Sequence, residues 1–322
     1  MNKINKLCIC VALAGATALA QAQTTYPTRA VRLIVPSSPG GGTDISARIL
    51  APQLTQFLGQ QVVVENRPGA GTMIGGEAVA RAVPDGYTLL MGISTLAINP
   101  SMYKKVPYDA LKDLAPISQA VALSNVLVIH PSLPSRNLKE FIAFARARPG
   151  QINFASAGVG TSPHLSMELF LVLAKLNMLH VPYKGSGPGV TDLLAGHVPV
   201  MMPNMLSAQP HIKSGRLRAL GVTGSKRAPG ADDIPTIAEA GVPGYEAVQW
   251  YGVLAPAATP RDIINRLHTG IVRALQNPEV RQRLLNDGAE PVGSSPAEFA
   301  EYLRSETAKW ANVIKAAGIK AE

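Results

Sequence analysis

The stretch "LIVPSSPGGGTDISARIL" (33–50) decides the fold. A short apolar run at 31–35 leads into three consecutive glycines, and apolar residues with helical spacing follow. Glycines in a row cost chain entropy on folding, so a fold retains them where the backbone must approach another group closely. The question is therefore what approaches the backbone at 40–42.

The same order of strand, Gly-rich turn and helix recurs in "INFASAGVGTSPHLSMELF" (152–170). Weaker copies are "VVVENRPGAGTMIGGEAVARA" (62–82) and "HVPYKGSGPGVTDLLAG" (180–196). Free N–H groups and the positive end of the helix dipole make such a turn suitable for binding an anion. The two clearest turns, closed by Thr43 and Thr161 as predicted helix N-caps, therefore predict two half-sites facing each other across a cleft.

The N-terminus predicts export. Two lysines precede the apolar segment "LCICVALAGATALA", and "AQA" at 20–22 is a small-residue cleavage site. We predict that residues 1–22 are a secretory signal peptide, too short for a membrane span and cleaved after Ala22. The two cysteines, Cys8 and Cys10, lie inside it. The mature chain is therefore expected to have no disulfide, no thiol catalysis and no Cys-ligated zinc.

Length and charge narrow the function classes. The chain has 322 residues, which exceeds a typical single domain and favours two lobes. Its net charge of +9 becomes +7 (9 − 2) when the two signal-peptide lysines are removed. The basic residues are scattered, with few aromatic residues beside them, which argues against a nucleic-acid partner. A mild positive field suits small anionic ligands.

Strand-like and helix-like segments alternate along the chain, which predicts α/β architecture with largely parallel sheets. The last three predicted helices follow one another without a strand between them, so we expect them to pack onto a sheet formed earlier. The predicted strands are 31–35, 62–65, 88–91, 126–129, 152–155, 179–181, 198–202 and 217–222, and the predicted helices are 44–58, 74–82, 138–146, 163–173, 189–195, 261–275, 278–287 and 296–317.

In the order and spacing of its motifs, the chain resembles the Bug-type periplasmic solute-binding proteins, the receptors of tripartite tricarboxylate transporters. Besides the four turns, the matching segments include "INPSMY", "LRALGVTGSKR", "IPTIAEAGVPGYEAVQWYGVLAPAATP" and "NPEVRQRLLNDGAEP". The resemblance covers nearly the whole mature chain.

The resemblance implies a two-lobed Venus-flytrap fold of the periplasmic-binding-protein type, in which the chain crosses twice between the lobes. Lobe 1 is expected at 23–123 plus 250–322, and lobe 2 at 124–249. A periplasmic monomer without a cofactor is implied, with a small carboxylate as ligand. Membrane transporter subunits or a sensor kinase are the expected partners.

In the family, main-chain amides and ordered water hold the ligand carboxylate, with contributions from both Gly-rich loops. Two departures from the family pattern concern the pocket wall: Ser37 replaces an aromatic residue, and Pro199 and Met202 replace an acidic and an aromatic one. The first should leave the wall smaller and more polar. Carried over to this chain, the ligand-binding residues are Ser37, Gly40, Gly41, Gly42, Thr43, Asp44, Ser94, Gly160, Thr161, His164, Tyr183, Lys184 and Gly185.

Several of these residues also have an ordinary structural interpretation. Asp44 is either a first-turn acid that suits the helix dipole or a group that orients bound water. His164 and Glu168 lie one helical turn apart, but they do not form H-E-x-x-H and no third metal ligand is evident. Lys184 is either solvated or contacts the ligand, and Trp250 and Tyr251 pack in the core or at a hinge unless they reach the site.

An exported hydrolase-like enzyme on an α/β scaffold is the alternative function. The segment "SMYK" (101–104) matches S-x-x-K, but no K-T-G follows and no G-x-S-x-G elbow occurs. We therefore predict a binding protein and not an enzyme. Backbone amides read the carboxylate and not the remainder of the ligand, so tricarboxylates, dicarboxylates, acidic amino acids and aromatic acids all remain open.

Overall fold

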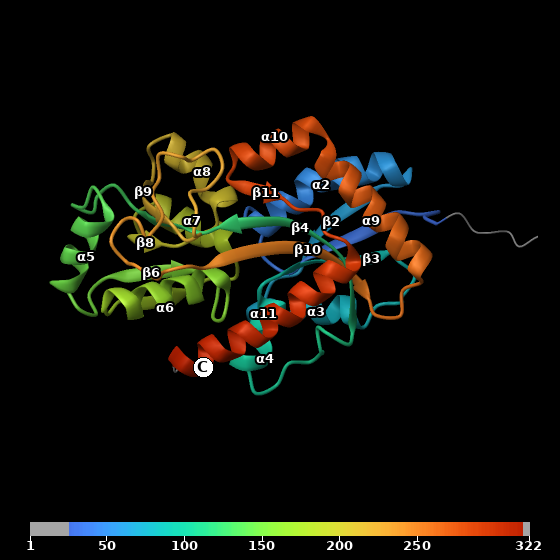
Figure 1. The fold of residues 1–322 in the computed structure, drawn as a ribbon, viewed down its shortest axis with the longest axis horizontal. Coiled ribbons are helices and arrows are strands. Elements are labelled where there is room, and N and C mark those ends of the chain that lie inside the picture. Colours follow the sequence, from blue (N-terminus) through green and yellow to red (C-terminus); the bar gives the residue numbers. More distant parts are fainter. Residues whose placement is uncertain (1–25, 318–322) are drawn as a thin grey trace, which may run out of the picture.

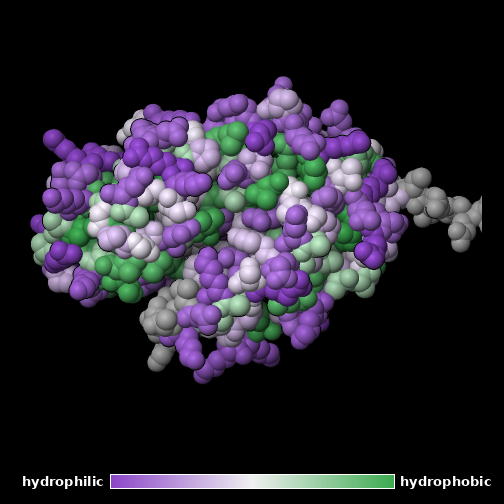
Figure 2. Space-filling view, in the orientation of Figure 1, coloured by the Kyte–Doolittle hydropathy of each residue, from purple (hydrophilic) through white to green (hydrophobic). Residues whose placement is uncertain are grey.

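The structure, a computed structural model, describes residues 26–317 (Figure 1). The predicted signal peptide, with Cys8 and Cys10, lies outside the described residues. The described chain forms two α/β lobes, each with a mixed sheet covered by helices on both faces. Figure 2 shows polar residues over most of the visible face of both lobes, with an apolar area at the lower left where α6 lies. None of the helices described in residues 26–317 has the length and apolar character needed to cross a membrane.

Lobe 1 is built on a sheet that has six strands among the described residues, in the order β11-β4-β10-β3-β1-β2. Strand β1 pairs in parallel with β2 and β3, whereas β10 is antiparallel to β3 and β4. Val31, Leu33 and Val35 face one apolar cluster and Ile34 faces another, so β1 is buried on both faces as central strands are. The strands are β1 (Val31–Val35), β2 (Val62–Asn66), β3 (Thr88–Ile93), β4 (Leu114–Ser124), β10 (Val248–Pro256) and β11 (Ala289–Pro291).

Helices cover both faces of this sheet because each presents an apolar stripe to it. Leu50 and Leu54 of α2 pack with Leu267 of α9 on one face, and α11 lies across the other face (Figure 1). Helix α2 ends at Gly59, whose positive φ of 71° is the usual left-handed C-cap. The helices of lobe 1 are α2 (Gly42–Leu58), the 3₁₀ turn η1 (Ala70–Thr72), α3 (Met73–Ala80), α4 (Thr95–Met102), α9 (Arg261–Gln276), α10 (Pro278–Asn286) and α11 (Pro296–Ala317).

Lobe 2 has a sheet of five described strands in the order β7-β6-β8-β5-β9. Phe141 of α5 and Phe170 of α6 stack in the apolar cluster on one face, and α7 and α8 cover the other face. Its strands are β5 (Val126–Ile129), β6 (Asn153–Ser156), β7 (Leu179–Pro182), β8 (Val200–Met201) and β9 (Arg218–Val222), and its helices are α5 (Leu138–Arg146), α6 (Ser162–Ala174), α7 (Ser186–Leu194) and α8 (Met205–Lys213).

The chain crosses between the lobes at two neighbouring points. Strand β4 of lobe 1 ends at Ser124 and β5 of lobe 2 begins at Val126, and the chain returns where β10 begins at Val248. Asn125 lies between β4 and β5 and is bonded to lobe 2. Its amide nitrogen Nδ2 donates to the hydroxyls of Ser162 and Ser166, both at 2.9 Å. The paired strands β4 and β10 therefore connect the two lobes side by side.

The sheets are mixed, whereas the sequence predicted largely parallel sheets. The antiparallel pairs involve β4 and β10, which carry the chain out of lobe 1 and back into it, and β5, which pairs antiparallel with β8 and β9. Neither β4 nor β10 was expected as a strand. The expected uninterrupted run of three C-terminal helices is also wrong, since β11 lies between α10 and α11.

Candidate functional site

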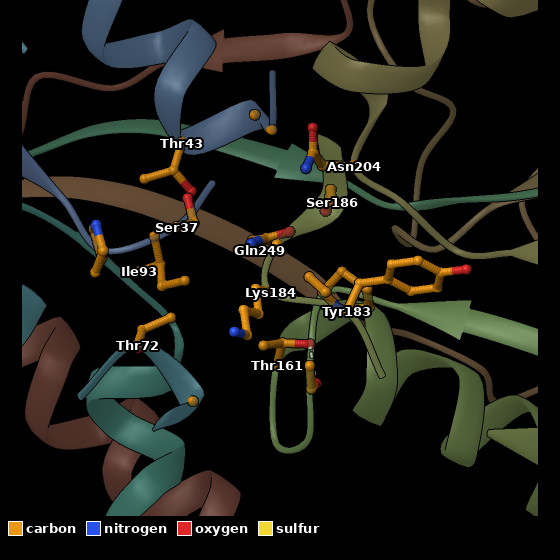
Figure 3. Close-up of a pocket in the computed structure, with 18 of the residues that line it drawn as sticks. Ser37, Thr43, Thr72, Ile93, Thr161, Tyr183, Lys184, Ser186, Asn204 and Gln249 are labelled. Atoms are coloured by element: carbon orange, nitrogen blue, oxygen red, sulfur yellow. Dashed lines mark hydrogen bonds between the residues drawn. The ribbon is translucent and has the colours of Figure 1, made fainter. Parts of the chain in front are cut away.

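Helix N-termini from both lobes meet at one cavity between the lobes (Figure 3). Within residues 26–317, the N-cap residues of five α-helices line it: Gly41 of α2 and Thr72 of α3 from lobe 1, and Thr161 of α6, Gly185 of α7 and Asn204 of α8 from lobe 2. Asn204 caps its own helix, because its Oδ1 accepts the Ser207 N–H at 3.0 Å. For the other four helices, no side chain of the described residues caps the first turn.

The local electrostatics of this cavity follow from those helix ends. The first amides of an α-helix have no partner within the helix, and the helix dipole adds partial positive charge there. Four such ends converge on a cavity of about 50 Å³. The backbone itself therefore makes this cavity favourable for a small anion.

The two lobes touch directly along the rim of the cavity. The Ser38 backbone N–H of lobe 1 donates to the Lys184 carbonyl oxygen of lobe 2 at 3.2 Å. Farther along the rim, the Tyr103 hydroxyl donates to the Val159 carbonyl oxygen, also at 3.2 Å. These contacts and the small cavity indicate the closed arrangement of the lobes.

The close approach of the lobes explains why the turns are rich in glycine. A Cβ atom added at Gly187 would overlap the Pro39 carbonyl oxygen of the opposite lobe. One added at Gly42 would overlap the Asn204 side-chain oxygen from lobe 2 and the Tyr251 hydroxyl. In this arrangement the other lobe is what comes near the glycines of 40–42, in addition to any ligand between them.

The lobe-1 turn is held by a buried carboxylate. Asp44, which is 3% exposed, accepts the Gly40 N–H and bonds to Arg48 Nε and Asn66 Nδ2, each at 3.0 Å. Burial alone would raise the pKa of Asp44, but the hydrogen bonds from Arg48, Gly40 and Asn66 outweigh it and hold the pKa below its ordinary value. Asp44 therefore shapes the turn from behind and does not line the cavity.

Lys184 and its neighbour Tyr183 point in different directions. Figure 3 shows the Lys184 ammonium group in the cavity, between Thr72 and Thr161. Lys184 forms no ion pair with any carboxylate of residues 26–317, so its charge is available to a ligand. The Tyr183 ring points away, and its hydroxyl donates to Asp192 at 2.6 Å. Burial and this hydrogen bond raise the pKa of Tyr183 to about 12.

Uncharged polar groups complete the wall. The Ser37 hydroxyl, the Gln249 side-chain oxygen and the Tyr251 hydroxyl are buried against the cavity, and none has a hydrogen-bond partner among the described residues. Burial raises the pKa of Tyr251; the Thr43 hydroxyl nearby opposes that shift without reaching hydrogen-bonding geometry. A buried polar group without a partner is costly, so these three groups can gain by bonding a ligand.

The predicted site residues divide into two sets. Lining the cavity are Ser37, Gly41, Gly42, Thr43, Thr161, Tyr183, Lys184 and Gly185. The other five lie behind the cavity or at its edge. Gly40 approaches Gly187 at the rim, and Ser94 is fully buried at the start of α4. Asp44, Gly160 and His164 form hydrogen bonds that support the turns.

Of the two expected helix N-caps, Thr161 is confirmed in position and Thr43 is wrong. Thr43 is the second residue of α2 and not its N-cap, because the helix begins at Gly42. Thr161 occupies the N-cap position of α6, but its hydroxyl donates to the Gly158 carbonyl oxygen at 2.6 Å instead of accepting from the helix. Both threonines therefore leave the amides of the first turn open towards the cavity.

Sequence reasoning missed part of the lining. Gly69, Gly71 and Thr72 belong to a Gly-Thr turn that was noticed as a copy of the other turns but not assigned to the site. Pro36, Ala157, Gly158, Pro163 and Ser186 lie within the other quoted turns but were not assigned to the site, whereas Ile93, Asn204, Gln249 and Tyr251 lie outside all four turns. The missed lining residues are Pro36, Gly69, Gly71, Thr72, Ile93, Ala157, Gly158, Pro163, Ser186, Asn204, Gln249 and Tyr251.

The two family departures in lobe 2 lie away from the cavity. Neither Pro199 nor Met202 lines it, and Met202 is fully buried in the lobe-2 core, where its sulfur lies 3.3 Å from the Tyr245 hydroxyl. Ser37, by contrast, lines the cavity.

Comparison with known proteins gives a consistent result. Residues 46–319 match the model of the tripartite tricarboxylate transporter family receptor. Protein BugT of Bordetella pertussis is 42% identical over 314 residues, which cover 97% of this chain and 96% of BugT. The solved structure of R. palustris Rpa4515 with adipate has a TM-score of 0.90 at 37% identity and covers 92% of this chain and 100% of that chain. MatC of Rhodopseudomonas palustris with bound malate has a TM-score of 0.84 at 32% identity, with coverages of 90% and 100%.

Proposed function

We propose that this chain, which belongs to the tripartite tricarboxylate transporter receptor family, captures a small carboxylate between its two lobes and delivers it to a membrane transporter. Receptors of this family are periplasmic solute-binding proteins that work with transporters. The export of this chain through cleavage after Ala22, its lobe boundaries near residues 123 and 249, and a monomeric state are parts of the same proposal.

The observation that carries the proposal is the convergence of four helix N-termini without side-chain caps on one small cavity. Each N-terminus stabilises a negative charge by about 0.3–1 kcal/mol, and more where it is partly buried. Lys184 adds one full positive charge. The relatives with adipate and malate support a carboxylate as the anion.

In this proposal the residues have distinct roles. The first-turn amides after Gly41, Thr161 and Gly185, and those of α3 beyond Met73, bind the carboxylate oxygens, directly or through water; the Met73 N–H itself donates to the Ala70 carbonyl oxygen. Lys184 supplies charge. The uncharged groups of Ser37, Gln249 and Tyr251 bond to the remainder of the ligand, and Asp44 and His164 hold the two turns in shape.

The hydrolase alternative meets a structural obstacle. Ser156 and His180 form a hydrogen bond of 2.6 Å, which is the pairing that a serine nucleophile needs. However, Ser156 is fully buried, its Oγ already accepts the Gly158 N–H at 3.0 Å, and it does not line the cavity. A substrate in the cavity could not reach this hydroxyl, which favours a binding protein. An assay of the purified protein with simple esters and amides tests this alternative. A hydrolase would cleave them, and we expect no cleavage.

A thermal-shift screen tests the proposal. The mature protein would be incubated with malate, adipate, citrate, glutamate and benzoate, and separately with glucose and ribose. A ligand present at about 100 times its dissociation constant adds about 2.7 kcal/mol to the free energy of unfolding. We expect at least one carboxylate to raise the melting temperature and the sugars to leave it unchanged. Stabilisation by a sugar and by no carboxylate would contradict the proposal.

A further inference from the structure

The two Gly-rich turns of the site share one backbone arrangement. Gly40 and Gly160 each precede a helix N-cap residue and have left-handed φ angles of 78° and 73°. The N-cap residues that follow, Gly41 and Thr161, have φ/ψ of −82°/162° and −74°/159°. Positive φ is open to glycine at little cost, so the sequence can form this turn at both places.

The same position of each helix holds the turn in this shape. In lobe 1, the side chain of Asp44, the third residue of α2, accepts the Gly40 N–H at 3.0 Å. In lobe 2, the third residue of α6 is His164, and its Nδ1 accepts the Gly160 N–H at 3.1 Å. The bond joins residues i and i+4 in both lobes, but the acceptor is a carboxylate in one and an imidazole in the other.

We propose that His164 is the positioning residue of the lobe-2 half-site and that it makes this half-site sensitive to acid, whereas Asp44 leaves the lobe-1 half-site insensitive over the same range. An imidazole nitrogen accepts a hydrogen bond only while it carries no proton. When His164 is protonated, Nδ1–H and the Gly160 N–H become two donors facing each other. The turn must then move, and the amides of Thr161 and Ser162 move with it.

The groups around His164 are consistent with both protonation states. On its own helix, Glu168 Oε1 lies 3.5 Å from Nε2, so the neutral ring can direct an Nε2 proton to it and leave Nδ1 free. The carboxylate would also stabilise the protonated ring. From lobe 1, the Tyr103 hydroxyl lies over the turn and donates to the Val159 carbonyl oxygen.

His180 of β7 stacks on His164 with 4.0 Å between ring centroids. Burial, and then the neighbouring His164, lower the pKa of His180 to about 4. His180 therefore stays neutral over the range in which histidines ordinarily titrate, about pH 5 to 8. Its Nε2 contacts the Ser156 hydroxyl, which accepts the Gly158 N–H, so the whole turn rests on this stacked pair.

The turn itself can be observed without any ligand. In mature protein labelled with ¹⁵N-glycine, NMR would follow the amide proton shifts of Gly160 and Gly40 and their exchange with water between pH 8 and 5. We expect the Gly160 signal to move and its protection, corrected for intrinsic exchange, to fall at least tenfold at pH 5. Gly40 should change little. A Gly160 amide that is equally protected at both pH values would overturn the proposal.

Two variants of similar size separate positioning from packing. Asparagine places its side-chain oxygen close to the site of Nδ1, whereas glutamine places its amide near Nε2. We expect His164→Asn to keep Gly160 protected at pH 8 and pH 5, and His164→Gln to lose the protection at both. Protection that survives in His164→Gln would show that packing alone holds the turn. If either variant fails to fold, the wild-type comparison of Gly160 with Gly40 still decides the question.

The link to binding rests on the proposed function and has its own readout. Calorimetry would use malate, adipate and any further carboxylate that stabilises the protein in the thermal-shift screen. We expect affinity in the wild type to fall at least tenfold from pH 8 to pH 5, and His164→Asn to change less than threefold over that range. Affinity that does not depend on pH in the wild type would overturn the role of His164 in binding. A Gly160 amide that titrates as expected in a protein that binds no carboxylate would instead refute the proposed function.

Discussion

The turns at Gly40–Asp44 and Gly160–His164 have nearly the same backbone but different electrostatic surroundings. In lobe 1 the turn rests on the buried carboxylate of Asp44, which accepts hydrogen bonds from Arg48 and Asn66. In lobe 2 it rests on a stacked pair of imidazoles, and Lys184 lies on the cavity side. The same backbone conformation is therefore supported by different side chains in the two lobes. Because Lys184 belongs to lobe 2, we expect lobe 2 to supply more of the positive charge that attracts the ligand.

The largest effect should come from blocking the contact between the lobes. In Gly187→Ala the new methyl group would overlap the Pro39 carbonyl oxygen, and the close atoms around it all belong to lobe 1. The substitution lies in α7, where alanine favours the helix, so the ligand-free melting temperature should hold or rise. Closure should fail, and calorimetry should show at least a hundredfold loss of affinity, about 2.7 kcal/mol.

Gly41→Ala is the matched control on the lobe-1 side. A Cβ atom there would have its nearest neighbours at 3.7 Å, which is ordinary contact, and Gly41 has no positive φ. We expect its affinity to stay within about threefold of wild type, less than about 0.7 kcal/mol. Equal affinities for Gly187→Ala and wild type would mean that binding does not need the closed arrangement.

The lobe-1 support should matter mainly for stability. Asp44→Ala leaves the Gly40 amide and the Asn66 side chain without their acceptor, which should lower the free energy of unfolding by about 2 kcal/mol. Asp44→Asn keeps an oxygen for Gly40 and should lose less. Chemical denaturation at pH 7 measures both variants, and equal losses would show that the charge and not the hydrogen bond to Gly40 is decisive.

The same residue predicts a pH dependence of stability. Because the folded-state pKa of Asp44 lies below its ordinary value, its contribution is fully present above the unfolded-state pKa and disappears as the pH falls through the folded-state pKa. The stability difference between wild type and Asp44→Asn should therefore be constant near neutrality and shrink below about pH 4. A difference that persists in strong acid would argue against a charged Asp44.

A substitution at Lys184 tests whether lobe 2 supplies more of the positive charge that attracts the ligand, and its effect on affinity should be smaller than that of Gly187→Ala. Lys184→Met keeps the side-chain length and the backbone carbonyl that accepts the Ser38 N–H, but removes the charge. We expect about a tenfold loss of affinity, near 1.4 kcal/mol, and a weaker dependence of affinity on salt. Lys184→Arg serves as control and should keep the salt dependence. Unchanged affinity in Lys184→Met would show that lobe 2 does not supply more of the attracting charge than lobe 1.

The smallest effect is expected at Tyr183. Its hydroxyl bonds to Asp192 and its ring points away from the cavity, so Tyr183→Phe should change affinity less than about twofold. The lost hydrogen bond should lower the free energy of unfolding, though by less than the loss of a buried hydrogen bond would. Calorimetry and denaturation measure the two quantities, and a large loss of affinity without a loss of stability would place the hydroxyl in the site after all.

The sequence predicted the parts of this site that are local. Each Gly-rich turn joins a strand to a helix within a few residues, so its place at the cleft follows from the chain order alone. The contributions of Asn204, Gln249 and Tyr251 could not be found in this way, because the fold brings them to the cavity from α8 and β10. Strand β10 itself was missed, although its apolar run is bounded by Gly- and Pro-containing segments that are typical of a buried strand.

Residues behind the turns show a second limit. Asp44 and His164 follow their glycines at the same spacing in the sequence, yet the spacing does not say whether a side chain turns towards the ligand or back to the Gly amide. That choice depends on what is packed around the helix start: Arg48 and Asn66 in lobe 1, and His180 in lobe 2. The sequence named both residues as ligand contacts, and their role as supports of the turns was visible only in the structure.

The most direct test of the account compares an acid with its own amide. Titration calorimetry would use the carboxylate that gives the largest thermal shift and the primary amide of the same acid, which keeps the shape and removes the charge. If helix N-termini and Lys184 hold a carboxylate, the amide should bind at least a hundredfold more weakly, a difference of about 2.7 kcal/mol. Equal affinity of the acid and its amide would contradict the central claim that this cavity binds an anion.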